Sequence, residues 1–187
     1  EEGTAILNDR VRLPIAPMIG VIGVAPSGEP IATGTPGDHG SNMDCKHIVK
    51  GSILYLPVEV PGALLALGDL HAVMGDGEVA ACGVEIPGEV DIRVSVLKGV
   101  QLPTPFLVEG GRLMTIASAE TLDAAVSEAT RRMHHFLQSR LGIETHEAGM
   151  LLSAAADLRI CQVVDPLKTA RMELPVWVAE RYGFCLD

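Results

Sequence analysis

Two short clusters of carboxylates and histidines, about thirty residues apart, hold the side chains best suited to chemistry in this chain. The first occupies residues 37–44 and the second residues 68–78. Their polar members are Asp38, His39, Asn42 and Asp44 in the first cluster and Asp69, His71, Asp76 and Glu78 in the second. Carboxylates and imidazoles on glycine-flanked turns that follow apolar strands are typical of a hydrolytic metal site.

The second cluster gives the stronger signal. Asp69 and His71 are two residues apart, and such residues point to the same side of an extended chain. Asp76 and Glu78 repeat this spacing, with Gly77 between them. Four titratable groups this close repel one another unless a cation lies among them. The alternative is a solvated acidic tip of a hairpin.

The first cluster follows residues 31–36, a segment that cannot be helical because of its glycine and proline. Asp38 and Asn42 could instead form turns with the loop backbone, which would leave His39 exposed. If histidine ligates, Zn²⁺, Mn²⁺ or Fe²⁺ suits the site, whereas Ca²⁺ suits carboxylates alone. The spacing does not choose among these ions.

Composition limits the class of protein. With 187 residues, of which 48% are hydrophobic and 20% charged, the chain can bury the core of one domain. A net charge of -10 and a pI near 5.0 argue against nucleic-acid or anionic-membrane partners. The four cysteines are widely spaced, as in a reducing cytosol, and no apolar run approaches a membrane span. We therefore expect a cytoplasmic protein.

The elements that position these clusters are predicted to be mainly strands. Residues 18–24 and 52–58 are short apolar runs, and residues 89–97 alternate polar and apolar side chains as in a strand with one wet face. A strand at 113–117 precedes a helix that begins after Ser118 or Thr121 and ends at Gly142. A second helix over 145–155 and a strand over 157–164 follow.

These elements predict an α+β fold that is mainly β, with a β-sandwich-like core, a C-terminal helical hairpin and a returning strand. Residues 1–111 form the β-rich core that carries the site loops, and residues 112–187 form the α/β part of the same domain. Signatures of serine hydrolases, phosphate-binding loops and dinucleotide-binding folds are absent from the sequence.

The order of several motifs resembles the acetamidase/formamidase family. The matching stretches are residues 17–26, 36–44, 54–58, 62–72, 75–79 and 164–166. The resemblance implies a β-sandwich core with α/β additions, a homodimer, and metal-dependent cleavage of formamide or acetamide to the acid and ammonia. Family members are typically longer at the N-terminus, so we expect the N-terminal portion of the family to be absent and a missing fragment to be a possible partner.

The clusters and the resemblance together suggest metal-assisted hydrolysis of a small amide. Asp69 and His71, joined by His39 or Asp44, would hold the ion, with zinc preferred and calcium possible as a structural ion. The remaining roles are a general base, Glu78 or Asp76, and an amide or oxyanion donor, Asn42.

Two other readings of the sequence are open. In one, a carboxylate or thiol nucleophile performs the chemistry and the metal is structural Ca²⁺. In the other, the chain is a non-catalytic metal-bound β-domain, or a subunit of a nicked or truncated amidase that is inactive alone.

Overall fold

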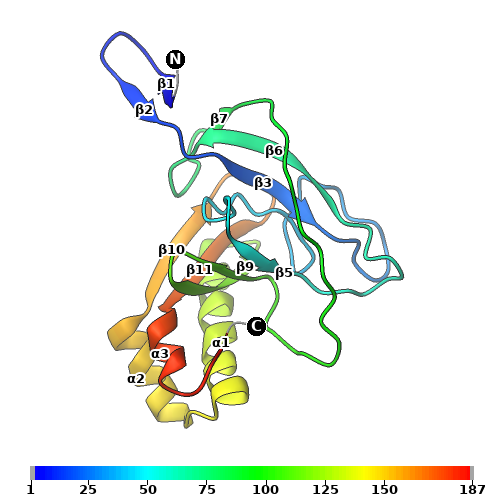
Figure 1. The fold of residues 1–187 in the computed structure, drawn as a ribbon, viewed down its shortest axis with the longest axis vertical. Helices are drawn as coiled ribbons and strands as arrows, with labels where there is room; N and C mark the ends of the chain where they lie inside the picture. Colours follow the sequence, from blue (N-terminus) through cyan, green and yellow to red (C-terminus); the bar gives the residue numbers. More distant parts are fainter. Residues whose placement is uncertain (1–2, 186–187) are drawn as a thin grey trace.

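A computed structural model, which describes residues 3–185, arranges the chain as two β-sheets and a helical layer (Figure 1). The four-stranded sheet has the order β4-β3-β6-β7 and the five-stranded sheet the order β10-β11-β9-β8-β5. The first comprises β3 (Met18–Gly23), β4 (Gly40–Asn42), β6 (Ala66–Val73) and β7 (Val84–Glu85). The second comprises β5 (Ile53–Tyr55), β8 (Phe106–Glu109), β9 (Arg112–Ala119), β10 (Asp157–Gln162) and β11 (Lys168–Pro175). A separate hairpin, β1 (Thr4–Ile6) with β2 (Arg12–Pro14), extends away from both sheets.

The two predicted helices begin and end where the sequence indicates, and a third, short helix was not predicted. α1 (Leu122–Leu141) starts after Thr121, whose side chain accepts a hydrogen bond from the Ala124 amide at 3.2 Å. It ends at Gly142, whose φ of 66° lies in the left-handed region that glycine tolerates. α2 (Thr145–Ala155) completes the helical hairpin, and the short α3 (Val176–Glu180) follows β11.

Two apolar layers join these elements. One lies where the helices cover the five-stranded sheet and includes Phe106, Met133 and Phe136. The other includes Ile22 of the four-stranded sheet and Ile116 of the five-stranded sheet, so it holds the two sheets together. This architecture confirms the predicted α+β class with its β-rich core, helical hairpin and returning strand β10. No helix of the described part of the chain is long and apolar enough to cross a membrane.

The predicted strand at residues 89–97 is wrong in one respect. The segment is extended, but it joins neither sheet, and it runs over the surface between β7 and β8 (Figure 1). Alternation of side chains predicts an extended backbone, whereas a strand also needs a neighbour for its hydrogen bonds. The predicted strand at 52–58 is present only as β5 (Ile53–Tyr55), because Pro57 lacks the amide that a longer ladder would use.

Phe136 provides a test of the helix–sheet layer. Its buried ring lies 5.0 Å from the Phe106 ring and 5.5 Å from the Phe184 ring, measured between centroids. We expect Phe136→Ala to lower the free energy of unfolding by about 3–5 kcal/mol, because it leaves a cavity. Urea unfolding measures this loss, with the exposed neighbour His135→Ala as the control. Equal losses in the two variants would contradict this description of the core.

Candidate metal centre

His71 is the residue around which the carboxylates converge. It lies on β6 with a side chain that is 1% exposed, and β7 pairs with it through Glu85. Nε2 of His71 is 3.1 Å from Oε1 of Glu85 and 3.4 Å from Oδ1 of Asp69. Farther away, Oε1 of Glu78 lies 3.9 Å from Nε2, and Oδ1 of Asp44 lies 4.0 Å from Nδ1. One imidazole is thus surrounded by four carboxylates.

These side chains form two groups that share His71. Asp44, His71 and Glu78 form the buried group, and Asp69, His71 and Glu85 form a more exposed one. Within each group, one potential ligand atom from every residue lies within 4.8 Å of the others. The structure therefore brings together three of the four residues expected to hold the metal, and it adds Glu78 and Glu85.

A contact between the two sheets places Glu78. The amide of Gly77 donates to the carbonyl of Cys161 at 2.9 Å, and the amide of Val163 donates to the carbonyl of Gly77 at 3.1 Å. These bonds attach the loop after β6 to the end of β10. The five-stranded sheet consequently contributes to the geometry of a site whose histidine lies on the other sheet.

Asp76 takes no part in either group. Its Oδ1 and Oδ2 accept hydrogen bonds from Nη1 and Nη2 of Arg171 at 2.8 and 2.9 Å, and Nζ of Lys46 is 3.1 Å from Oδ2. Partial burial opposes ionisation of this carboxyl, but the two cations prevail and hold its pKa below the usual value. Asp76 is therefore a structural anion.

Three polar atoms at the site have no hydrogen-bond partner among residues 3–185: Oδ1 of Asp44, Nδ1 of His71 and Oδ2 of Asp165. Asp44 and His71 are each 1% exposed. Buried polar groups almost always have a partner, so three unpaired atoms at one place require an explanation. Carboxylate oxygens and an imidazole nitrogen are the ligands that zinc and similar divalent cations accept. The donor set fits such a cation.

Burial and mutual repulsion disturb the acidity of these carboxyls. Burial, followed by the negative charge of Glu78, raises the pKa of Asp44 to about 8. Burial likewise raises the pKa of Glu78, although the nearby His71 opposes that shift. The pKa of Asp165 rises mainly for the same reason. The Asp44 carboxyl therefore keeps its proton at neutral pH unless a cation replaces it.

Backbone strain coincides with the candidate ligands. Asp44, Asp69 and Glu78 have φ values of 45°, 55° and 44°, in the left-handed region that non-glycine residues rarely adopt. Such conformations cost about 1–3 kcal/mol each and persist mainly at functional sites. Their concentration on three acidic residues of one cluster points to a function for that cluster.

Gly20 of β3 leaves the space in which two of the carboxylates lie. A Cβ atom at this position would be 2.6 Å from Oδ1 of Asp44 and 2.6 Å from Oδ2 of Asp69. Gly83 likewise leaves space for His71, because a Cβ atom at position 83 would lie 2.8 Å from Nδ1 of the His71 ring. The site therefore depends on two glycines as well as on its polar residues.

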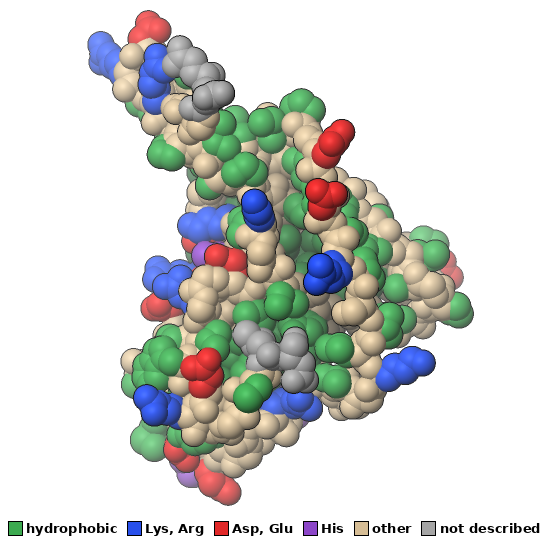
Figure 2. Space-filling view, in the orientation of Figure 1, with side chains coloured by type: hydrophobic (Ala, Val, Ile, Leu, Met, Phe, Trp, Pro, Cys, Tyr) green, Lys and Arg blue, Asp and Glu red, His purple; other side chains and the backbone are tan. Residues whose placement is uncertain are grey.

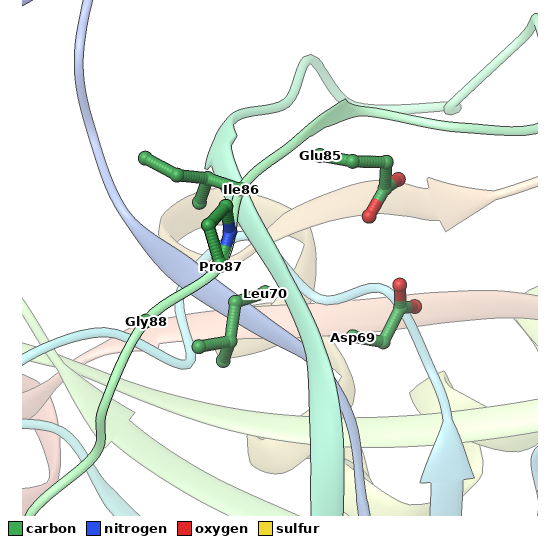
Figure 3. A pocket seen from close by; sticks show the side chains of 6 residues that line it. All are labelled: Asp69, Leu70, Glu85, Ile86, Pro87 and Gly88. Carbon is green, nitrogen blue, oxygen red and sulfur yellow. The ribbon is translucent and has the colours of Figure 1, made fainter.

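The exposed group opens onto a groove of about 420 Å³ (Figure 3). The carboxylates of Asp69 and Glu85 point toward one another at one side of the groove, and their side chains are 35% and 53% exposed. The remaining lining residues are Leu70, Ile86, Pro87 and Gly88. The groove thus joins a pair of carboxylates to a mainly apolar surface that is accessible to a small molecule.

His39 does not join either ligand group in the described part of the chain. Its side chain is buried, and burial lowers its pKa although Asp38 and Glu59 oppose the shift. Asp38 forms an ion pair with Arg132. Residues 37–40 do form a tight turn, closed by hydrogen bonds between Gly37 and Gly40, but His39 within it is buried and not exposed.

Burial raises the pKa of Asp165, and the nearby side chains of Asp44 and Asn42 oppose this shift, so Asp165 belongs to the same cluster. Sequence reasoning missed Asp165 as a site residue, as it missed Glu85. Both positions carried a signal: Asp165 is the polar residue in the turn at 164–166, and Glu85 ends the apolar run after the second cluster. Their proximity to His71 and Asp44 depends on pairing between distant strands, which the sequence does not display.

Comparison with known proteins finds relatives of this chain. The model of the acetamidase/formamidase family matches residues 28–180. Formamidase of Methylophilus methylotrophus is 48% identical over 64 residues, which are 34% of this chain and 16% of that protein. Acetamidase of Mycolicibacterium smegmatis is 36% identical over 111 residues, which are 52% of this chain and 27% of that protein.

Solved structures agree over almost the whole chain. A Bacillus halodurans acetamidase is 55% identical with a TM-score of 0.96, and the match covers 98% of this chain and 62% of that one. A predicted acetamidase/formamidase of Thermoanaerobacter tengcongensis is 49% identical with a TM-score of 0.96, covering 100% of this chain and 62% of that one. The chain therefore spans less than two thirds of the proteins that it matches.

Gly20→Ala tests the space between the carboxylates. We expect the added methyl group to displace Asp44 and Asp69 and to weaken zinc binding by about 10–100-fold, the range found when groups that support metal ligands are altered. Isothermal titration calorimetry measures the affinity. Gly68→Ala is the matched control, because Gly68 pairs with the same strand and a Cβ there meets no atom within 4 Å. Similar zinc affinities in both variants would contradict the proposed position of the ligands.

The raised pKa of Asp44 predicts how the metal-free protein responds to pH. The unfolded chain loses this proton near 3.8, whereas the folded protein keeps it up to about 8. Stability that this group contributes at low pH is therefore lost as the pH rises between these values. Urea unfolding in EDTA should show this decline, and Asp44→Asn should reduce it because the amide stays neutral. The exposed control Asp9→Asn should leave the decline unchanged; an unchanged decline in Asp44→Asn would refute the assignment.

Proposed function

The chain belongs to the acetamidase/formamidase family, and on that premise we propose that it is the metal-binding part of a hydrolase that cleaves small aliphatic amides. The substrates are formamide or acetamide, and the products are the carboxylic acid and ammonia. The observation that carries the proposal is the pair of buried, unpartnered atoms, Oδ1 of Asp44 and Nδ1 of His71, which face each other at 4.0 Å.

Asp44, His71 and Glu78 are the residues that would hold the ion, with zinc as the preferred cation. A divalent cation bound there supplies a Lewis acid for the amide carbonyl and lowers the pKa of water. Calcium is the alternative if the ion is structural and only carboxylates bind it. The mixture of imidazole and carboxylate ligands favours zinc.

We assign proton transfer to Glu85 rather than to Glu78 or Asp76. Asp76 is paired with Arg171, and Glu78 lies in the buried ligand group. Glu85 borders the groove, and burial, with the neighbouring charge of Asp69, raises its pKa although His71 opposes this. Its carboxylate would accept a proton from the attacking water and deliver it to the amide nitrogen, which must be protonated to leave as ammonia.

Asn42 and Asp69 support this arrangement. Asn42 lies close enough to Asp165 to lower the pKa of that carboxyl, so we assign Asn42 as a positioning residue for the cluster. Asp69 lies opposite Glu85 at the groove, where it can orient the amide NH₂ group by accepting a hydrogen bond. The apolar remainder of the groove suits the short alkyl group of a small amide.

A second candidate function is a metal-bound β-domain that is inactive alone. The observation in its favour is that the chain spans 62% of the solved relatives, so their activity belongs to longer proteins. Cytoplasmic localisation and a homodimeric assembly stay predictions.

Two substitutions separate the metal ligands from the proton-transfer residue. We expect His71→Ala to lose both bound zinc and the release of ammonia from formamide and acetamide. Glu85→Gln should keep its zinc but release ammonia at least about 100-fold more slowly, as is typical when a general base is removed. Zinc is measured by elemental analysis and ammonia by a coupled assay, and EDTA should abolish the activity.

The exposed helix residue His135 provides the control, since His135→Ala should match the parent in both measurements. Zinc binding without ammonia release in the parent chain would favour the second candidate. Unchanged zinc content and activity in His71→Ala would refute the metal site itself.

A further inference from the structure

The side chain of Gln162, on β10, is fully buried and holds the turn between β10 and β11. Its Oε1 accepts hydrogen bonds from the amides of Val164 and Asp165 at 2.9 and 3.0 Å. Its Nε2 donates to the carbonyl of Leu167 at 2.7 Å and to Oγ1 of Thr169 at 2.9 Å. An amide side chain has two donor hydrogens and two acceptor lone pairs, so these four bonds satisfy it completely. One side chain therefore fixes both ends of the turn that carries Asp165.

A β-bulge in β10 lies at Gln162. The register between β10 and β11 shifts between Ile160 and Gln162, and such bulges change the direction of a side chain and are common next to active sites. An isolated parallel bridge also joins Gln162 to Gly77, the residue before Glu78. The same short segment of β10 therefore holds the loop that carries one candidate ligand and the turn that carries Asp165.

Asp165 brings a further carboxyl group to the buried ligand group. Its Oδ2 is buried and has no hydrogen-bond partner within residues 3–185. Burial and the charge of Glu78 are the larger causes of the raised pKa of Asp44, and the charge of Asp165 adds to them, so the two carboxyls lie close together. Acidic side chains on the face drawn in Figure 2 are dispersed over the exposed surface, whereas these carboxyls gather in the interior. Neither ligand group in the described part of the chain includes Asp165, which makes it an outer partner of Asp44.

We propose that Asp165 and Gln162 are positioning residues for the cation site: Asp165 is the anionic partner of the ligand Asp44, and Gln162 holds Asp165 beside it. The inference rests on the proposed cation site and adds two residues that act on the ion through a ligand. Partners of this kind orient the ligand, and a negative charge behind it attracts a divalent cation. Without the bonds from Gln162, the turn would be free to carry the Asp165 carboxylate away from Asp44.

A double-mutant cycle on zinc affinity tests the proposal. Asp165→Asn removes the charge and keeps the shape, whereas Gln162→Met removes all four hydrogen bonds and keeps a side chain of similar length. Isothermal titration calorimetry with zinc alone measures the affinity of the metal-free chain. Each single variant should bind zinc about 10–100-fold more weakly than the parent, the range found for partners of metal ligands. The double variant should bind no more weakly than Asp165→Asn, because Gln162 acts only through Asp165.

Asp157→Asn is the matched control, because Asp157 lies on the same strand with a side chain that is 57% exposed, and its zinc affinity should equal that of the parent. Equal affinities of Asp165→Asn and the parent overturn the inference, and this comparison does not require Gln162→Met to fold. Losses that multiply in the double variant assign Gln162 a general structural role and overturn its positioning role. Absence of zinc binding in the parent overturns the proposed cation site, and this inference with it.

Discussion

The ion pair between Arg171 and Asp76 fixes the relation between the two sheets at the candidate site. Arg171 is 1% exposed on β11, and besides two bonds to Asp76 its guanidinium donates to Glu173 at 2.7 Å and to the carbonyl of Ile160 at 3.0 Å. A buried cation is tolerated only when its donors are paired, and removal of one partner typically costs about 3–5 kcal/mol. Because Glu78 follows Asp76 by two residues, the same pair places a candidate ligand.

The site itself opposes folding in several ways. Carboxylates from strands and loops of the four-stranded sheet approach one histidine, three of them on strained backbone, and Gly20 and Gly83 supply the space for this approach. In most of a protein, backbone propensity, packing and the pairing of polar groups all favour the same fold. Functional sites are the places where some of these factors oppose it. The Arg171–Asp76 pair and the apolar layer between the sheets provide the stability that holds such a cluster together.

Local patterns in the sequence predicted what depends on neighbours along the chain. The cap at Thr121 and Gly142 bounds α1, and the two-residue spacing of Asp69 and His71 places both near one point on β6. Contacts between residues far apart in the sequence could not be predicted in this way. Arg171 is 95 residues from Asp76. Glu85 pairs with His71 at a point after which the register between β6 and β7 becomes irregular. Segment 89–97 has the alternation of a strand, but alternation alone does not supply a partner.

The different surroundings of the two ring nitrogens of His71 have a consequence for its tautomer. A neutral imidazole carries one N–H and one lone pair, so its nitrogens cannot play the same role. Glu85 and Asp69 lie nearest Nε2, which favours a proton on that nitrogen and leaves the lone pair of Nδ1 directed to the side of Asp44. Carboxylates at the groove would in this way select the nitrogen that is available for coordination in the interior.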